Sequence, residues 1–198
     1  MSFFFETAYN EYMKVRCPWA EGHPLLQEYH DNEWGVPLHD ESKHFEFLML
    51  ETMQAGLSWL TILKKREAFR EAFYGFEAEK IARFSGSDID VLMQNPGIIR
   101  YRRKLESAVR NAQVFLDIRS EWGSFDSFLW SFTEGKVIDH GLESQADMPV
   151  KSELAEQVSA ALKRYGMSFV GPVTVYAHLQ AVGVINDHLR SCFRYKSV

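Results

Sequence analysis

The two cysteines and two of the histidines are placed so that they could share one metal ion. Cys17 and Cys192 are the only cysteines, which excludes a framework of several disulfides and suits a reducing compartment. His188 lies four residues before Cys192, a spacing that turns two ligands to one side of a helix. With His30, the set would complete a tetrahedral site that has no open position, which favours one structural Zn²⁺ per chain. The alternative is two free buried thiols and two packed or exposed histidines.

A bound metal would have consequences beyond its ligands. Asp31 and Asp187 each adjoin a histidine of the set and could accept a hydrogen bond from its ring. The metal would also join the N- and C-terminal segments and close a loop of roughly 160 residues, which removes entropy from the unfolded chain. We therefore expect chelation to lower the stability of the protein.

The stretch at residues 29–35, Tyr-His-Asp-Asn-Glu-Trp-Gly, places aromatic rings beside one of these histidines. On a helix that ends near Gly35, His30 and Trp34 share one face and Tyr29 lies beside them. Such a wall could line a binding site. The alternative is a capped helix end with a packed tryptophan.

Glu51 falls on the apolar side of a predicted helix, among leucine and alanine residues. A carboxyl group in such surroundings needs a partner or a function. Together with Trp59, Tyr29 and Trp19 it would form a pocket suited to a flat cationic ring. The alternative is a solvated or helix-capping glutamate.

Helices must position all of these residues, because apolar residues recur at three- and four-residue steps along most of the chain. Asp40, Ser58 and Ser87 are the predicted N-caps of three of the helices. Residues 135–149 form a polar connection, and no partner strands are evident, so the predicted fold class is all-α. The predicted helices are 24–34, 41–55, 59–69, 77–84, 88–94, 105–116, 124–132, 151–165, 173–184 and 187–194.

The segment Asn-Pro-Gly-Ile-Ile-Arg, residues 95–100, predicts a tight turn inside a helix-hairpin-helix motif near residues 88–117. Such a turn exposes backbone N–H groups that can hold a phosphate, while nearby arginines neutralise its charge. An ordinary helical hairpin with a Pro-Gly turn is the alternative. The net charge of −5 gives no global sign of nucleic-acid binding, so DNA contact would rest on the basic clusters 64–66 and 100–104.

Length and composition limit the architecture. The 198 residues, 46% hydrophobic and 14% aromatic, suit one globular domain over residues 17–198, or one domain with a small lobe, after an N-terminal extension at 1–16. No signal peptide is evident. The uncharged run 167–185 contains Gly171, Pro172 and Gln180 and predicts a buried helix instead of a membrane span. We expect a cytoplasmic monomer that does not contact membranes.

Six ordered blocks in the chain resemble 3-methyladenine DNA glycosylase I, the TAG family of helix-hairpin-helix DNA glycosylases. The resemblance covers residues 16–195 and departs from the family at the N-terminal extension and at Leu26, where the family can carry an aromatic residue. The blocks are residues 17–19, 29–35, 51–59, 97–100, 169–171 and 186–192.

The resemblance implies a helix-hairpin-helix glycosylase fold with a structural zinc site, and it assigns roles to particular residues. The zinc ligands are Cys17, His30, His188 and Cys192. The catalytic residue is Glu51, and the base pocket is formed with Tyr29 and Trp59, with Trp19 and Trp34 nearby. The DNA contacts are Gly56, Leu57, Gly97, Ile98 and Arg100.

The implied reaction is hydrolytic excision of 3-methyladenine from alkylated double-stranded DNA in base excision repair, with the free base as product. The nucleotide is flipped out of the duplex, and the charge on the alkylated base makes it a good leaving group. Nothing in the sequence calls for a lysine Schiff base, so no lyase step is expected. Other helix-hairpin-helix glycosylases carry an aspartate near the position of Asp117, but the TAG family lacks that group. The alternatives are a zinc-stapled, non-catalytic DNA-binding module and a broader alkyl-purine glycosylase.

Overall fold

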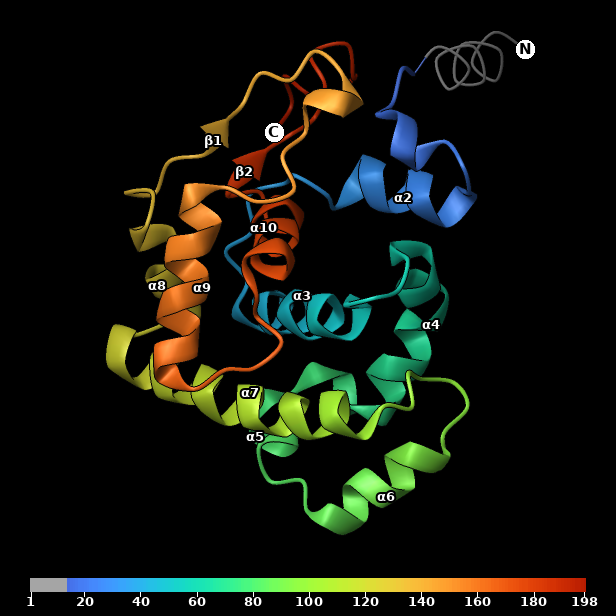
Figure 1. Cartoon of the computed structure of the whole chain (residues 1–198), viewed down its shortest axis with the longest axis vertical. Coiled ribbons are helices and arrows are strands. Elements are labelled where there is room, and N and C mark those ends of the chain that lie inside the picture. The colour runs from blue at the N-terminus through green and yellow to red at the C-terminus, as the bar shows by residue number, and fades with distance from the viewer. Residues whose placement is uncertain (1–13) are drawn as a thin grey trace, which may run out of the picture.

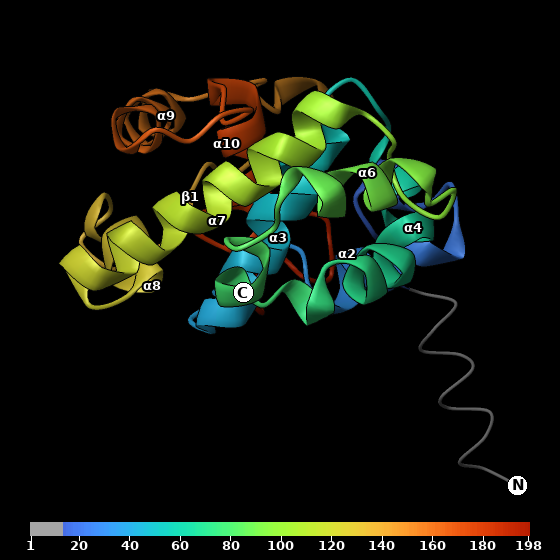
Figure 2. The same cartoon turned by 90° about the horizontal axis from the view of Figure 1, so that it is seen from below.

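The computed structural model describes residues 14–198, and the prediction of an N-terminal extension falls largely outside them. The described chain is mainly helical, as predicted (Figures 1 and 2). Helix α3 (Glu41–Gln54) runs through the centre, and ten of its 14 residues are buried. It contacts α4 (Trp59–Ala72), α7 (Arg102–Trp122), α8 (Phe125–Ser131) and α10 (Pro172–Ala181). The core therefore surrounds the helix that carries Glu51.

The starts of the helices follow the predicted capping chemistry at two of three positions. The Asp40 side chain accepts a hydrogen bond from the Lys43 amide at 2.9 Å, and Ser58 caps α4 in the same way. The prediction of Ser87 as a cap is wrong, because α6 (Gly86–Gln94) begins two residues earlier than predicted. There Ser85 and Asp88 bond reciprocally in a capping box, which satisfies two helix-end donors at once.

The helix predicted over residues 77–84 is shorter in the structure. A 3₁₀ turn η2 (Tyr74–Phe76) precedes α5 (Ala78–Ile81), and the chain then turns so that the Phe84 ring stacks on Phe73 with 6.1 Å between ring centroids. Burial of this aromatic pair outweighs continuation of a helix with few apolar residues.

The prediction of a C-terminal helix over residues 187–194 is wrong, because the segment forms consecutive turns. Asn186 explains the difference: its side-chain oxygen accepts from the His188 amide at 3.1 Å, and its amide donates to the Tyr195 carbonyl at 3.2 Å. These local bonds compete with helical hydrogen bonding. Strand β2 (Ile185–Asn186) also pairs in parallel with β1 (Ile138–Asp139), so the connection 135–149 contains a short strand and the 3₁₀ turn η3 (Gln145–Asp147).

The two N-terminal elements pack against each other, the second also contacts α4, and the segment after them reaches the end of α10, where the Gly35 amide donates to the Gln180 carbonyl at 3.0 Å (Figure 1). They are the 3₁₀ turn η1 (Pro18–Ala20) and α2 (Pro24–Asn32), while α9 (Glu153–Tyr165) covers α10 on its other side. Gly183 permits this arrangement: its φ is +70°, and a Cβ there would lie 2.4 Å from the backbone of Val36 and Pro37. Within residues 14–198, no helix combines the length and the apolar character needed to cross a bilayer.

Candidate functional site

The predicted metal ligands meet in one buried cluster. The ligand atoms of Cys17, His30, His188 and Cys192 all lie within 4.8 Å of one another. Cys192 Sγ is 3.4 Å from His30 Nε2 and 3.6 Å from His188 Nδ1, and Cys17 Sγ is 3.8 Å from His188 Nδ1. The edges of a tetrahedron with metal–ligand bonds of about 2.0–2.3 Å measure about 3.3–3.8 Å. The cluster therefore has the donor set and the spacing of a four-coordinate metal site.

The outer nitrogen of each histidine is held by an acceptor, which fixes the ring for binding. His30 Nδ1 lies 2.9 Å from Asp31 Oδ1, as predicted, and Asp31 is itself paired with Arg16 at 2.8 Å. His188 Nε2 lies 3.0 Å from the Trp34 carbonyl oxygen, so the prediction that Asp187 supports His188 is wrong. The tight turns of this segment point the Asp187 carboxylate away from its neighbour.

The ionisation of Cys192 and the small size of Gly35 both favour metal binding at the cluster. Hydrogen bonds from the Cys17 thiol, His188 and His30 lower the pKa of Cys192, which favours the thiolate that a metal requires. Gly35 has a φ of +78°, and a Cβ at this position would lie 2.9 Å from the His188 ring. The glycine that follows Trp34 is therefore required for His188 to reach its place.

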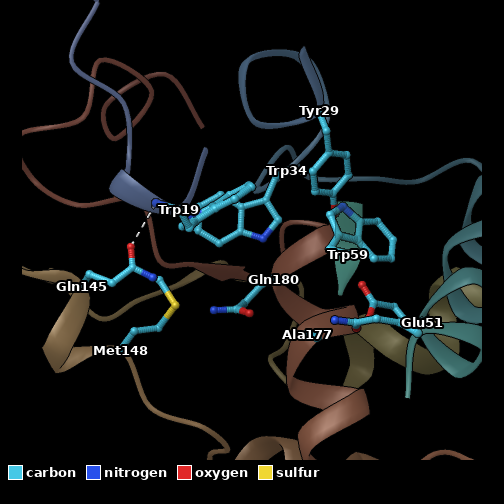
Figure 3. Close-up of a pocket in the computed structure, with 10 residues that line it drawn as sticks. Trp19, Tyr29, Trp34, Glu51, Trp59, Gln145, Met148, Ala177 and Gln180 are labelled. Carbon is cyan, nitrogen blue, oxygen red and sulfur yellow. Dashed lines mark hydrogen bonds between the residues drawn. The ribbon is translucent and has the colours of Figure 1, made fainter. Parts of the chain in front are cut away.

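A pocket of about 180 Å³ opens next to this cluster and contains the predicted Glu51 (Figure 3). Tyr29 and Trp59 form one wall, with ring centroids 5.1 Å apart, and Trp19 and Trp34 form another, 5.0 Å apart. This volume lies below the roughly 300–1,000 Å³ of pockets for drug-sized ligands, so the pocket suits a single small ring system. The sequence thus identified five of the residues that line it.

Two buried polar atoms in this pocket have no protein partner in the described chain. They are Glu51 Oε2 and Trp59 Nε1, an oxygen and an N–H donor. Glu51 is only 3% exposed, and burial raises the pKa of its carboxyl group to about 8. Burial and the nearby Glu51 charge likewise raise the pKa of Tyr29. Unpartnered polar groups at this depth are expected where a ligand supplies the missing contacts.

The sequence did not single out half of the residues that line the pocket. Gln180 could have been found from the sequence, because a glutamine in a predicted apolar helix needs a hydrogen-bond partner when it is buried. Leu26, where the chain departs from the family pattern, is not among the residues that line the pocket. The lining residues that the sequence did not single out as such are Gln54, Gln145, Met148, Ala177 and Gln180.

The hairpin between α6 and α7 is present as predicted, and its turn is anchored to α4. Lys65 Nζ donates to the carbonyls of Pro96 and Gly97 at 3.0 and 3.1 Å. The Gly97 amide donates to the Asn95 side chain at 2.8 Å, and the Ile98 side chain is buried. Gly97 and Ile98 thus shape the turn, while the Arg100 side chain is exposed.

One residue of the predicted basic cluster 64–66 is largely withdrawn from solvent. Arg66 bonds to Glu33 through both terminal nitrogens at 2.7 Å and to the buried Glu46 at 2.8 Å, so it joins α2 to α3 and α4. The prediction that residues 64–66 form a solvent-facing basic face is therefore wrong at Arg66. A carboxylate buried on the apolar face of α3 requires this partner.

The loop between α3 and α4 carries Leu57, which is 40% exposed and lies in the chain between Gln54 and Trp59, two residues that line the pocket. Gly56 turns this loop with a φ of +82°. Lys104, buried at the start of α7, donates to the Met53 and Ala55 carbonyls at 2.7 and 2.6 Å and so closes the end of α3.

Asp117 lies exposed on α7 and is not among the residues that line the pocket. This position agrees with the prediction that Asp117 is not catalytic.

The sequence matches one protein family over most of its length and is similar to relatives with known names. Residues 19–195 match the family model described as methyladenine glycosylase. The chain is 45% identical to "DNA-3-methyladenine glycosylase" of Haemophilus influenzae, over 91% of this chain and 97% of that protein. It is 40% identical to "DNA-3-methyladenine glycosylase 1" of Escherichia coli K12, over 91% and 96%.

A solved structure agrees with the sequence matches. It describes 3-methyladenine recognition by 3-methyladenine DNA glycosylase I (TAG) from Staphylococcus aureus. The two chains share 47% identity, with a TM-score of 0.87, over 90% of this chain and 95% of that one. The fold, the buried cluster and the sequence therefore agree, and the chain belongs to the methyladenine glycosylase family.

Proposed function

We propose that this enzyme is a DNA-3-methyladenine glycosylase that flips 3-methyladenine out of alkylated double-stranded DNA and hydrolyses its glycosidic bond. The observation that supports this most directly is the buried, unpartnered Glu51 carboxyl group within a small pocket of aromatic rings. Relatives carry this activity in their names, and one solved relative is described by its recognition of 3-methyladenine.

Charge selects the lesion in this proposal. Alkylation at N3 makes adenine cationic, and the Tyr29 and Trp59 rings stabilise a cation by on the order of 1–2 kcal/mol for each contact. Glu51 supplies the opposite charge in a site with little water, where the attraction is strong. An unmodified adenine is neutral and gains none of this stabilisation, so the pocket discriminates by charge as well as by shape.

Hydrolysis then needs little further chemistry. A cationic base is already a good leaving group, so the pocket need only stabilise the extruded nucleotide while water attacks the sugar carbon. None of the described residues that line the pocket is a lysine, and Lys104 is engaged at the end of α3. With no amine placed to form a Schiff base, we infer a monofunctional enzyme without lyase activity.

The proposed DNA contacts lie on the loop between α3 and α4 and on the turn between α6 and α7. We infer that Gly56 and Leu57 fill the gap left by the flipped nucleotide, because Leu57 is an exposed apolar side chain on the loop between Gln54 and Trp59, which both line the pocket. At the hairpin, the Ile99 and Arg100 amides are not among the donors of backbone hydrogen bonds in residues 14–198, unlike the Gly97 amide. These amides and the Arg100 side chain are the proposed phosphate contacts.

The Cys₂His₂ cluster is proposed to hold one structural Zn²⁺. Two thiolate and two imidazole donors suit zinc, and four protein ligands leave no position for a catalytic water. A bound metal ion would cross-link the N-terminal and C-terminal segments of the domain. We infer a single domain over residues 17–198 that acts as a monomer, and cysteines kept reduced as ligands suit the cytoplasm.

Chromatography of the bases released from methylated duplex DNA tests this function. Wild type is expected to release 3-methyladenine, Glu51→Gln far less, and metal analysis should find about one zinc per chain. Release of no base would support a non-catalytic DNA-binding module. Release of 7-methylguanine at an equal rate would support a broader alkyl-purine glycosylase.

A further inference from the structure

The block Phe-Val-Gly at residues 169–171 is the only one of the six family blocks to which the proposed mechanism gives no role. It lies in the loop between α9 and α10, and Phe169 is its unusual residue. The φ of Phe169 is +57°, a left-handed conformation that a bulky side chain adopts only at a cost in stability. Within residues 14–198, its partly exposed ring is also not among the hydrophobic side chains that pack on the core. Core packing therefore does not explain the strained conformation.

Buried polar side chains hold the loop on both sides of Phe169. Asn111, on α7, is 1% exposed, and its side chain donates to the Ser168 carbonyl and accepts from the Ser168 amide, both at 2.9 Å. Ser159, on α9, is equally buried and donates to the Val170 carbonyl at 2.6 Å. These bonds fix the residue before and the residue after Phe169, so two helices impose the strained conformation on the residue between them.

The loop places the Phe169 ring against Tyr101, at the hairpin. The two ring centroids are 6.5 Å apart, and the rings are nearly perpendicular, at 87°. Tyr101 directly follows the turn 97–100, forms the N-cap of α7 and is 44% exposed. Two residues after Phe169, a Cβ at Gly171 would meet no atom within 4 Å, so the surface there is open. The pair is thus an exposed aromatic surface next to the proposed phosphate contacts.

This surface is continuous with the rest of the proposed DNA interface. The Tyr101 carbonyl accepts from the Lys104 amide at 2.9 Å, and Lys104 Nζ donates to the Ala55 carbonyl at 2.6 Å, at the start of the loop that carries Leu57. On the other side, the exposed Val173 lies four residues before Ala177, which lines the pocket, so both lie on one face of α10. The aromatic pair therefore joins the hairpin to the gap loop and to the helix that borders the pocket.

We propose that Phe169, supported by Tyr101, is a second apolar contact to duplex DNA and packs on bases left unstacked beside the flipped nucleotide. This inference rests on the proposed function. Flipping deprives neighbouring base faces of a stacking partner, and an apolar or aromatic side chain can take that place. A ring held by buried hydrogen bonds loses little freedom on binding. The exposed Arg100 on the adjoining turn adds the positive charge that favours DNA as the partner.

Phe169→Gly tests the inference, because glycine adopts the same φ without strain and the substitution removes only the ring. The probe is a DNA duplex with one tetrahydrofuran abasic analogue, and its affinity is measured by fluorescence anisotropy. We expect the Kd to rise at least fivefold, the lower value for loss of one ring that stacks on a base. The denaturant midpoint should not fall, because the substitution relieves strain without opening the core.

The matched control is Tyr74→Gly, which removes another exposed aromatic side chain at a positive φ. Tyr74 lies on η2, in the connection between α4 and α5, on the far side of the domain from α10 (Figure 2). The Kd of Tyr74→Gly for the same duplex should stay within twofold of wild type.

Two further measurements separate a ring that contacts DNA from one that only shapes the hairpin. Loss of an apolar contact leaves the salt dependence of Kd unchanged, whereas displacement of the phosphate-binding turn lowers its slope by about one for each phosphate contact. Tyr101→Ala should also weaken binding, and the double variant should lose less than the product of the two single losses, because the rings act as a pair.

The possible outcomes distinguish this inference from the proposed function. An unchanged Kd or a lowered denaturant midpoint in Phe169→Gly, a reduced salt slope, or single losses that simply multiply would each overturn the inference and leave the proposed function standing. A wild-type protein that binds the abasic duplex no more tightly than undamaged duplex would overturn both.

Discussion

The pH dependence of base release is the most direct consequence of the buried carboxyl group. Burial raises the pKa of Glu51 to about 8, so the unliganded enzyme carries a proton on Glu51 at neutral pH. A cationic base needs the ionised form, and its charge favours loss of that proton once bound. The reaction of free enzyme with lesion should therefore quicken as pH rises, and level off above pH 8.

The size of the effect follows from the ionised fraction of Glu51. With a pKa of about 8, this fraction rises about 50-fold between pH 6 and pH 8, and kcat/KM should rise by the same factor because it reports the free enzyme. The kcat measured at saturating DNA should vary much less, since the bound cation lowers the pKa. Glu51→Gln cannot ionise, so its profile should be flat. Its kcat/KM at pH 8 should be about 10- to 150-fold below wild type, the value of a hydrogen bond to a charged group.

The assay is release of 3-methyladenine from methylated duplex DNA at limiting enzyme, from pH 5.5 to 9, corrected for spontaneous loss of the base. A wild-type profile that is flat between pH 6 and 8, or the same rise in Glu51→Gln, would refute the assignment of the raised pKa to Glu51.

Stability gives an independent check of the same group. The folded pKa lies above the unfolded value of 4.5, so the folded state holds the extra proton, and its advantage is lost as pH rises from 4.5 through 8. Glu51→Gln escapes this loss. Its stability relative to wild type should therefore grow by on the order of 3 kcal/mol between pH 5 and pH 8, measured by denaturant unfolding.

Three further predictions concern the metal cluster and two buried basic residues, His178 and Lys104. Chelation by a strong zinc ligand should lower the free energy of unfolding by on the order of 5 kcal/mol, because it opens a long closed loop; an unchanged denaturant midpoint would contradict a bound structural metal. Burial, and to a lesser extent the nearby His44, lowers the pKa of His178 to about 3, so below pH 6.5 the unfolded chain takes up a proton that the folded chain does not. The free energy of unfolding of wild type should therefore fall by about 2 kcal/mol between pH 7 and pH 5, and His178→Leu should not show this loss. Equal losses in the two proteins would contradict the prediction. Lys104→Met should slow release from duplex DNA about tenfold by loosening the loop that carries Leu57, while fluorescence titration still shows free-base binding; equal losses of both would place the lysine's role elsewhere.

The residues that carry chemistry were easier to predict than the backbone that places them. The two cysteines could be grouped from residue type, because few side chains bind zinc and the chain has only two cysteines. His188 was selected by its four-residue spacing from Cys192, and the family resemblance implied the full ligand set with His30. The supposed reason for the His188–Cys192 pairing was nevertheless wrong. A four-residue spacing fits a helix, but the Asn186 side chain bonds to the local backbone and bends the segment into turns that serve the same purpose.

The pocket wall that comes from the connection 135–149 was not predictable from the pattern. Met148 and Gln145 follow β1, and β1 is held by its pairing with β2, far along the chain. A two-residue strand carries no periodicity, and such long-range pairing leaves no local signal in a single sequence. The prediction for Arg66 was wrong for a related reason, because its position in a basic cluster gave no indication of the buried Glu46 to which it bonds.

The metal cluster and the pocket are built from the same short segments, which explains why aromatic residues follow the ligands so closely. Trp19 comes two residues after Cys17 and meets the His30 ring at 5.4 Å, and Tyr29 adjoins His30. Helix α3 and α4, by contrast, present Glu51 and Trp59 from the core. Two of the aromatic residues are thus held by neighbouring ligands, and Trp34 is held by His188 through its carbonyl, while the charged group is held by helix packing. The pocket lies where these two supports meet, so the cluster that joins the chain ends also sets the distance between the rings and the carboxylate of the proposed base pocket.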